Sequence, residues 1–236
     1  MPVISLNDVS LTVDAASDAR PDAVNTILGP VSLTITESRV GIIGANGSGK
    51  STLARLFNGL ATPTEGTVLV NDQDVRTSRK QVRSLVGFIF SDADNQIIMP
   101  RVRDDVLFSL RRRGLPKSER LRRADEVLAR FDLTEHADDS PHTLSGGQKQ
   151  MLALASVLVL DPEIIVADEP TTLLDLRNRL RIAEEFRRLE QQLIVVTHDL
   201  DLLADFDRVI CLDEGQVIAD GAPRDAIDTY VSRMTA

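Results

Sequence analysis

A glycine-rich stretch with one lysine and two hydroxyl residues has the chemistry of a phosphate-binding loop. Its candidate binding residues are Gly44, Ala45, Asn46, Gly47, Ser48, Gly49, Lys50, Ser51 and Thr52. Glycines let backbone N–H groups turn toward an anion, and the start of the next helix adds the positive end of its dipole. Lys50 is predicted to reach the β- and γ-phosphates, and Ser51 to hold Mg²⁺. Because an apolar strand precedes the stretch and a helical pattern follows it, we expect a nucleoside triphosphate site; the alternative is a glycine-rich turn without a ligand.

Two carboxylates and a histidine stand at the ends of later apolar runs. Asp168 and Glu169 end the run from 164 to 167, and His198 follows the run from 193 to 197. Beside a phosphate loop, Asp168 is suited to Mg²⁺ through its water shell, and Glu169 to orienting or deprotonating the attacking water. Ligands bind at the carboxyl edge of parallel sheets, so His198 is predicted to contact the γ-phosphate. The alternatives are a solvated acidic turn and a structural histidine.

The other two histidines, His136 and His142, are predicted to be ordinary surface residues.

A second anion-binding helix start is predicted at 144–148, where Ser145 is a plausible N-cap and Gly147 leaves backbone N–H groups accessible. Two phosphate-binding helix starts in one chain suggest that one of them serves a nucleotide held mainly by another chain.

Composition limits the classes of protein that remain. The chain has 236 residues, enough for one large domain or two small ones, and its net charge of −9 disfavours a general nucleic-acid-binding surface. The longest apolar run, 151–160, is far short of the ~20 residues that cross a bilayer. The single Cys211 lies in an apolar run and is predicted to be a small buried residue. Any membrane role is therefore expected to come through a partner.

The order of the elements indicates the fold class. Residues 3–13 and 31–36 alternate like paired strands, and the Asp14–Pro30 stretch between them is predicted to be an exposed loop. Alternating strands and helices after the phosphate loop predict an α/β fold with a mostly parallel sheet and helices on both faces. From residue 91 the pattern becomes helical and arginine-rich. This run is predicted to be a solvated helix face, with a surface for acidic lipids or an acidic partner as the alternative.

In this order the motifs resemble the nucleotide-binding domain of ATP-binding-cassette (ABC) transporters. The stretch 44–52 is similar to the family's Walker A, 144–148 to its signature, and Asp168-Glu169 to the end of its Walker B. Leu174-Asp175 resembles the D-loop, and His198 the switch histidine. The resemblance implies a phosphate-loop NTPase of the ABC type, with an N-terminal antiparallel β part and a helical subdomain. Residues 1–90 and 160–236 would form the nucleotide-binding core of a single domain, and residues 91–159 the helical subdomain with the signature.

Within that family, residues 94–100 resemble a segment of energy-coupling-factor importers, and residues 169–178 with 204–208 are most similar to the ATPase of the biotin importer. The resemblance implies ATP and Mg²⁺ as cofactors, ATP hydrolysis coupled to transport, and a peripheral place on the cytoplasmic face of the membrane. The implied partners are a second ABC ATPase chain, either an identical copy or a paralogue, a transmembrane coupling subunit and a substrate-binding membrane subunit. Residues 91–105 are expected to receive a helix of the coupling subunit, with Gln96 as a contact. A cobalt, nickel or other vitamin importer, a soluble ABC protein acting on DNA or ribosomes, and a phosphate-loop kinase are the rival interpretations.

Two positions depart from the family pattern. Ser91 stands in the slot of the Q-loop glutamine, and a serine is too short to reach Mg²⁺ and the attacking water in the same way. Val13 occupies the slot where the family usually stacks an aromatic side chain on adenine. Weaker ATP binding and stronger competition by GTP are expected as a result.

Overall fold

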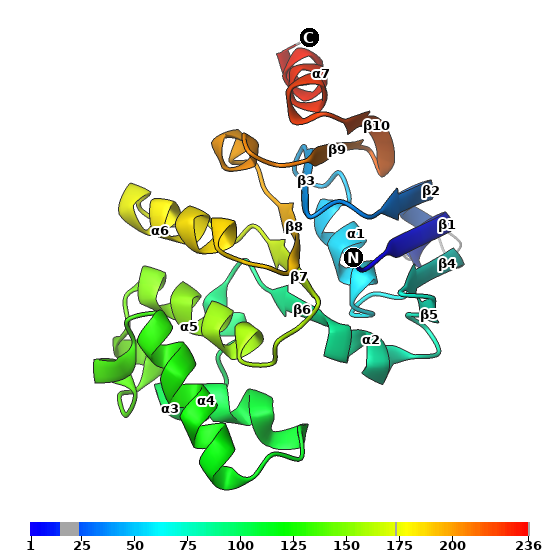
Figure 1. Cartoon of the computed structure of the whole chain (residues 1–236). Coiled ribbons are helices and arrows are strands. Elements are labelled where there is room, and N and C mark those ends of the chain that lie inside the picture. Colours follow the sequence, from blue (N-terminus) through cyan, green and yellow to red (C-terminus); the bar gives the residue numbers. More distant parts are fainter. Residues whose placement is uncertain (15–23, 173, 236) are drawn as a thin grey trace, which may run out of the picture.

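The central sheet has six strands (Figure 1). The computed structural model describes residues 1–14, 24–172 and 174–235 of the chain. The strand order is β10-β9-β3-β8-β7-β6, and only β10 runs antiparallel to its neighbour. The strands are β3 (Arg39–Gly44), β6 (Val86–Ile89), β7 (Ile164–Asp168), β8 (Gln192–Val196), β9 (Arg208–Asp213) and β10 (Gln216–Gly221). The mostly parallel sheet expected from the sequence is confirmed, and the carboxyl ends of β3, β7 and β8 share one edge.

A smaller antiparallel sheet packs beside it, in the order β2-β1-β4-β5. Its strands are β1 (Ile4–Asp14), β2 (Val24–Ile35), β4 (Glu65–Val70) and β5 (Gln73–Asp74). The predicted loop from Asp14 to Pro30 is wrong for residues 24–30, which pair with β1 as far as Asp14 opposite Val24. Pro30 and Gly29 had argued against a strand, but β2 is an edge strand, where neither residue interrupts a central ladder. The rest of that prediction, residues 15–23, lies outside the described residues.

Helices cover both faces of the central sheet. The α-helices of the described residues are α1 (Lys50–Phe57), α2 (Arg79–Leu85), α3 (Val102–Ser109), α4 (Lys117–Arg130), α5 (Gly146–Leu158), α6 (Leu176–Arg187) and α7 (Pro223–Thr235). Short 3₁₀ turns lie at 93–95, 110–112, 134–136, 141–143 and 200–203. No helix in the described ranges is both long and apolar enough to cross a bilayer.

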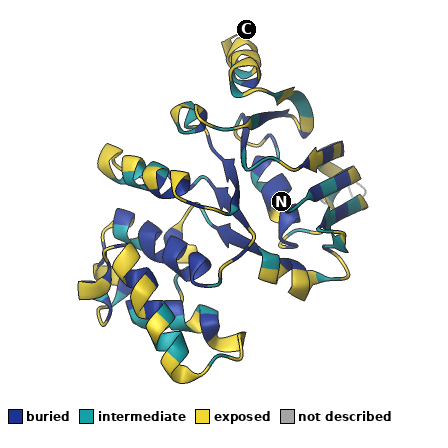
Figure 2. Ribbon diagram, viewed as in Figure 1, coloured by how far each residue is buried: buried dark blue, intermediate teal, exposed yellow. Residues whose placement is uncertain are grey.

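Alternation along β7 shows how one strand serves two cores. Ile164 and Val166 join the core formed with α1 and the antiparallel sheet. Ile165 and Ala167 join the core formed with α3, α4, α5 and α6. Successive side chains of a strand point to opposite faces, so β7 is buried on both sides, and Figure 2 shows it dark blue throughout. Cys211 on β9 is fully buried, as predicted, in a third core under α7.

The helical segment after β6 is tied to the end of that strand by two glutamines. Gln96 Oε1 accepts from Phe90 N at 3.1 Å, and Gln96 Nε2 donates to Ala153 O on α5 at 2.9 Å. From α5, Gln150 Nε2 donates to Phe90 O at 3.4 Å. Lys149 adds an ion pair with Asp94 at 2.7 Å. The signature helix α5 and the strand end therefore hold each other in register.

Ion pairs along α4 satisfy part of the arginine run. Arg122 pairs with Glu119 and Glu126, and Arg123 pairs with Glu119. These contacts at three- and four-residue spacing are typical of a solvated helix face.

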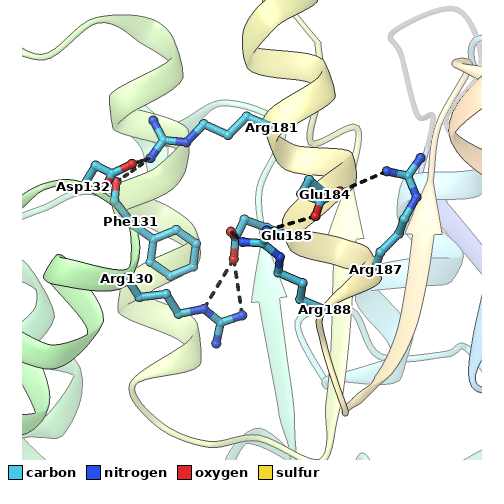
Figure 3. Close-up of polar contacts among 8 residues, drawn as sticks. All are labelled: Arg130, Phe131, Asp132, Arg181, Glu184, Glu185, Arg187 and Arg188. Carbon is cyan, nitrogen blue, oxygen red and sulfur yellow. Dashed lines mark hydrogen bonds and ion pairs between the residues drawn. The ribbon is translucent and has the colours of Figure 1, made fainter.

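A second set of ion pairs joins the end of α4 to α6 (Figure 3). Arg130 Nη2 lies 3.3 Å from Glu185 Oε2, and Arg188 Nη1 lies 3.3 Å from the other oxygen of the same carboxylate. Arg181 donates to the carbonyl of Phe131 at 2.9 Å and to Asp132 at 2.6 Å. Glu185 is 7% exposed, so its charge depends on the arginines for compensation.

We expect Glu185→Gln to lower the free energy of unfolding by about 1.5–3 kcal/mol, the usual contribution of a hydrogen bond to a charged group. Glu184→Gln is the matched control, because its carboxylate is half exposed and pairs at the surface with Arg187 and Arg188. The control should change stability by less than about 0.5 kcal/mol. Urea unfolding of both variants makes the comparison, and equal effects would contradict the assigned importance of Glu185.

Candidate functional site

The phosphate loop joins β3 to α1 and presents the start of α1 to the sheet edge. Gly49 is the N-cap residue and has φ +96°, a left-handed conformation that favours glycine. The Ser48 hydroxyl is buried, and no protein group bonds to it among the described residues. An unpartnered buried hydroxyl next to free helix-start N–H groups fits the loop to an anion. Asn46 and Gly47, which lie at the outer side of the loop, are exposed.

Lys50 points back into the loop instead of out to solvent. Lys50 is only 7% exposed, and its Nζ donates to the carbonyls of Gly44 and Ala45, both at 2.8 Å. Burial lowers the pKa of Lys50, while the charges of Glu169 and Asp168 oppose that change. The ammonium has three N–H donors, so one remains for a ligand.

Ser51 and Asp168 meet across the space between α1 and the end of β7. Ser51 Oγ donates to Asp168 Oδ1 at 2.8 Å, and Arg55 Nη2 lies 3.8 Å from Asp168 Oδ2. Asp168 is 2% exposed, and burial raises its pKa despite the Ser51 bond and the Arg55 charge. Arg55 was not among the residues predicted from the sequence. Its spacing of four residues from Ser51 on the same helix was the available signal, because such residues share a face.

Glu169 and His198 form a second pair at the same edge. His198 Nδ1 lies 2.7 Å from Glu169 Oε2. A carboxylate can only accept, so the proton of this bond belongs to Nδ1, and Nε2 can donate only when the imidazole is protonated. Glu169 has φ +52°, an uncommon conformation for a residue with a side chain. Such backbone strain is concentrated at functional sites.

Ser145 caps α5 as predicted, and a reciprocal bond completes the capping box. Gln148 N donates to Ser145 Oγ at 3.3 Å, and Ser145 N donates to Gln148 Oε1 at 2.8 Å. Gly147 packs so tightly on the start of α6 that an added Cβ would lie 2.2 Å from Asn178 Oδ1. The serine itself is exposed.

The structure thus brings together Lys50, Ser51, Asp168, Glu169 and His198, but not the signature residues. Among the hydrogen bonds of the described part of the chain, none joins Ser145 or Gly147 to the phosphate loop. Likewise, no cluster of three or more His, Cys, Asp or Glu side chains suited to a metal occurs among those residues. One carboxylate and one hydroxyl are the protein ligands that Mg²⁺ needs when phosphates and waters supply the others.

Two residues behave differently from their sequence predictions. Gln96, expected to contact a partner, uses both ends of its amide inside the chain, while Ser91 is exposed. His136, expected to be an ordinary surface residue, is bonded through both ring nitrogens, to Asp139 and to Gln148. Val13, in the predicted adenine slot, is 45% exposed near the end of β1.

Asp168→Asn should raise the melting temperature of the ligand-free chain at pH 8. Burial disfavours the charged form of Asp168, so the wild-type chain loses stability as pH rises through the range between the unfolded and the raised folded pKa. The asparagine removes this cost and keeps an oxygen acceptor for Ser51. The gain should disappear as the pH falls below the ordinary aspartate pKa of about 3.9, because the carboxyl group is then protonated in both the folded and the unfolded state. Thermal unfolding at several pH values measures it, and a gain independent of pH would contradict the burial argument.

Comparison with known proteins agrees with this geometry. Residues 28–172 match the sequence profile described as ABC transporter. A putative ABC transporter ATP-binding protein of Deinococcus radiodurans is 52% identical, over 92% of this chain and 94% of the relative. The biotin transport ATP-binding protein BioM of Rhizobium etli is 49% identical, over 86% and 90% respectively.

Among solved structures, the dimeric ATP-binding cassette MJ0796, in a post-hydrolysis state bound to ADP and Pi, superposes with a TM-score of 0.82. It is 30% identical, and the match covers 94% of this chain and 99% of the other. Profile, relatives and fold agree with the phosphate loop, the acidic end of β7 and the capped signature helix. The chain belongs to the ABC transporter family.

Proposed function

We propose that this chain is the ATP-hydrolysing subunit of an importer of the energy-coupling-factor type, with biotin as the first candidate substrate. The observation that carries the enzymatic part is the meeting of Lys50, Ser51, Asp168 and Glu169 at one sheet edge. The similarity to BioM supports biotin, and the segment from 94 to 100 supports the importer type. Cobalt, nickel or another vitamin would use the same ATPase chemistry.

In this proposal the phosphate loop holds ATP. Backbone N–H groups of 44–52 and the third donor of Lys50 bind the phosphates, and the orphaned Ser48 hydroxyl bonds to one of them. Ser51 and Asp168 hold Mg²⁺, which would neutralise charge on the phosphate oxygens. Their mutual bond at 2.8 Å already keeps both oxygens turned toward each other.

Glu169 is the proposed catalytic base. Its carboxylate accepts the proton of the attacking water, or orients that water in line with the γ-phosphate. His198 holds the carboxylate through Nδ1, and when protonated it can donate from Nε2 to a phosphate oxygen at the same time. We therefore assign to His198 a contact with the γ-phosphate that depends on its protonation.

A second ATPase chain completes each site in this proposal. Ser145 and Gly147 lie on a capped helix start that is not bonded to the chain's own phosphate loop, so we assign them to the γ-phosphate held by the partner. The partner is a second copy or a paralogue. A transmembrane coupling subunit and a substrate-binding membrane subunit complete the complex, and the ATPase lies peripherally at the cytoplasmic face of the membrane. Residues 91–159 act as a helical subdomain beside the core formed by 1–90 and 160–236.

The docking groove for the coupling subunit lies between the edge strand β6 and α3. It is lined by Phe88, Gln96, Ile98, Phe108 and Leu160, among others. Ile98 and Phe108 are 62% and 43% exposed, which are large values for apolar side chains. Asp105 Oδ1 holds the backbone next to this exposed apolar edge, because it accepts from Ile98 N at 2.9 Å and from Met99 N at 3.1 Å. A rigid apolar rim suits a helix of a membrane subunit, and Ile98 replaces Gln96 as the expected contact.

Co-purification tests the function as a whole. Affinity-tagged chain is isolated from detergent-solubilised membranes of its host, and mass spectrometry identifies what comes with it. The proposal expects two membrane subunits, and expects uptake of labelled biotin to stop when the chain is deleted. Recovery of ribosomal or DNA-bound partners instead of membrane proteins would refute the transport role, and uptake of a different vitamin or metal would reassign the substrate.

Glu169→Gln should lower ATP hydrolysis by roughly 10²- to 10⁴-fold while leaving ATP binding intact, because the amide cannot accept the proton of water. A dimer should then persist in size-exclusion chromatography with ATP and Mg²⁺. The matched control is Glu163→Gln, an exposed residue at the opposite end of β7, which should hydrolyse ATP at the wild-type rate. A strictly monomeric Glu169→Gln chain, with and without membrane subunits, would rule out the shared site.

Ile98→Asp should impair assembly with the membrane subunits or transport far more than the ATPase activity of the isolated chain. The charge would be buried without a partner when a helix docks. Val231→Asp, at an exposed apolar position on α7, is the control for an added surface charge. The yield of the complex and the uptake of substrate measure the effect, and unchanged values for both would remove the groove from the docking role.

A further inference from the structure

His136 lies in the 3₁₀ turn at 134–136, beside the start of the signature helix α5. Its Nδ1 is 2.9 Å from Asp139 Oδ2, and its Nε2 is 3.0 Å from Gln148 Nε2. The side chain is 35% exposed. A half-exposed histidine with a partner on each nitrogen is held in one orientation.

The bonds around Gln148 determine where the histidine proton lies. Gln148 Oε1 accepts from Ser145 N, so the NH₂ group of the amide must face His136. An amide N–H can only donate, and the facing Nε2 must therefore be a bare acceptor. The ring proton is consequently on Nδ1, from which it donates to the carboxylate of Asp139. The arrangement requires the neutral Nδ1–H tautomer.

Gln148 is thus held from two sides. His136 accepts from its Nε2, and Ser145 N donates to its Oε1. The Ser145 hydroxyl accepts from Gln148 N, which leaves its own proton free to donate to an incoming phosphate. Fixing the glutamine therefore fixes both the backbone and the hydroxyl of the serine.

We infer that His136 is a positioning residue for ATP hydrolysis, which keeps the Ser145–Gly147 helix start in the conformation that binds phosphate. The inference rests on the proposed function, because it takes the signature residues as ligands of the partner's nucleotide. It adds a residue that touches no substrate and acts through Gln148.

Protonation of His136 breaks this arrangement. A proton on Nε2 would face the NH₂ group of Gln148, two donors at 3.0 Å, and the glutamine must turn away. The charged groups nearby are the carboxylates of Asp139 and of Glu135 in the same turn. On the neighbouring helices, Arg103 of α3 pairs with Asp125 and Asp138, and Lys149 of α5 pairs with Asp94. The contact with Asp139 survives protonation, because Nδ1 still donates to the carboxylate. Protonation therefore breaks only the bond between His136 and Gln148, which supports the capping box.

The tautomer can be tested without nucleotide. The ¹⁵N NMR spectrum of the folded chain at pH 8 should show His136 as neutral, with a protonated Nδ1 and a bare Nε2. His142 is exposed in the adjacent turn and serves as the reference histidine in the same spectrum. An Nε2–H tautomer, or an imidazolium at pH 8, would overturn the inference whatever the activity of the chain.

The kcat values of two His136 variants distinguish loss of the hydrogen-bond acceptor from a general loss of folded structure. His136→Phe should lower kcat about fivefold at pH 8, the size of one lost helix cap, with little change in KM. His136→Gln keeps an oxygen that can accept from Gln148 and should retain wild-type kcat. His142→Phe, the matched control, should also remain at the wild-type rate. Thermal unfolding of each variant confirms that it is folded.

The pH profile distinguishes positioning from a merely structural role. As the pH is lowered, the wild type should lose more activity than His136→Gln, because a proton on Nε2 removes the acceptor of Gln148 and only the histidine can take up that proton. Parallel profiles for the two chains would overturn the inference even if His136→Phe were impaired. If no chain hydrolyses ATP, the proposed function fails, and the NMR result still decides whether His136 holds the capping box.

Discussion

Burial of the Lys50 ammonium inside its own loop is the constraint on which the candidate site at the carboxyl edge of the sheet depends. A buried charge without compensation costs several kcal/mol, and here two carbonyls of the loop and two carboxylates of the β7 end provide the compensation. The loop must curl around the lysine for its carbonyls to reach Nζ. Its N–H groups are then directed outward to the ligand. Burial lowers the pKa of Lys50 and raises that of Asp168, so it disfavours the charged form of both groups.

Two adjacent carboxylates serve different partners because the chain bends between them. In a regular strand, consecutive side chains point to opposite faces and could not both enter one site. Asp168 ends β7 in regular geometry and meets Ser51, whereas Glu169 turns at φ +52° and meets His198. The Glu169 N–H still bonds to Val196 O on β8 at 2.8 Å, so the neighbouring strand holds the strained residue in place. Strain that is anchored in this way keeps the carboxylate of Glu169, the proposed base, and the ring of His198 in one geometry.

The helical part of the chain is bonded both to the end of strand β6 and to helix α6. At β6, the Phe90 backbone bonds to Gln96 and Gln150. At α6, the buried Glu185 binds Arg130 at the end of α4 (Figure 3). Displacement of a docked helix at the groove would therefore act on α5 through Gln96, and on its capped start through the helix itself. Among the hydrogen bonds of the described residues none involves the Ser91 side chain, and the amide of Gln96 joins the strand end to α5.

Local sequence patterns were enough to identify the candidate binding and catalytic residues and to predict the order of strands and helices. A phosphate loop is specified by residue types at fixed spacing, and apolar strands ending in Asp168, Glu169 and His198 place those groups at one edge because parallel strands share their carboxyl ends. The sequence could not show which atoms would meet. The Arg55 and Asp168 contact, the inward turn of Gln96 and the two bonds of His136 join residues from separate elements, and only packing brings them together. The same holds for β2, where Gly29 and Pro30 predicted a loop from local sequence. Pairing with β1 makes this stretch an edge strand instead. Spacing along the chain determines what a residue can do, whereas long-range contacts determine its protonation, its orientation and its partner.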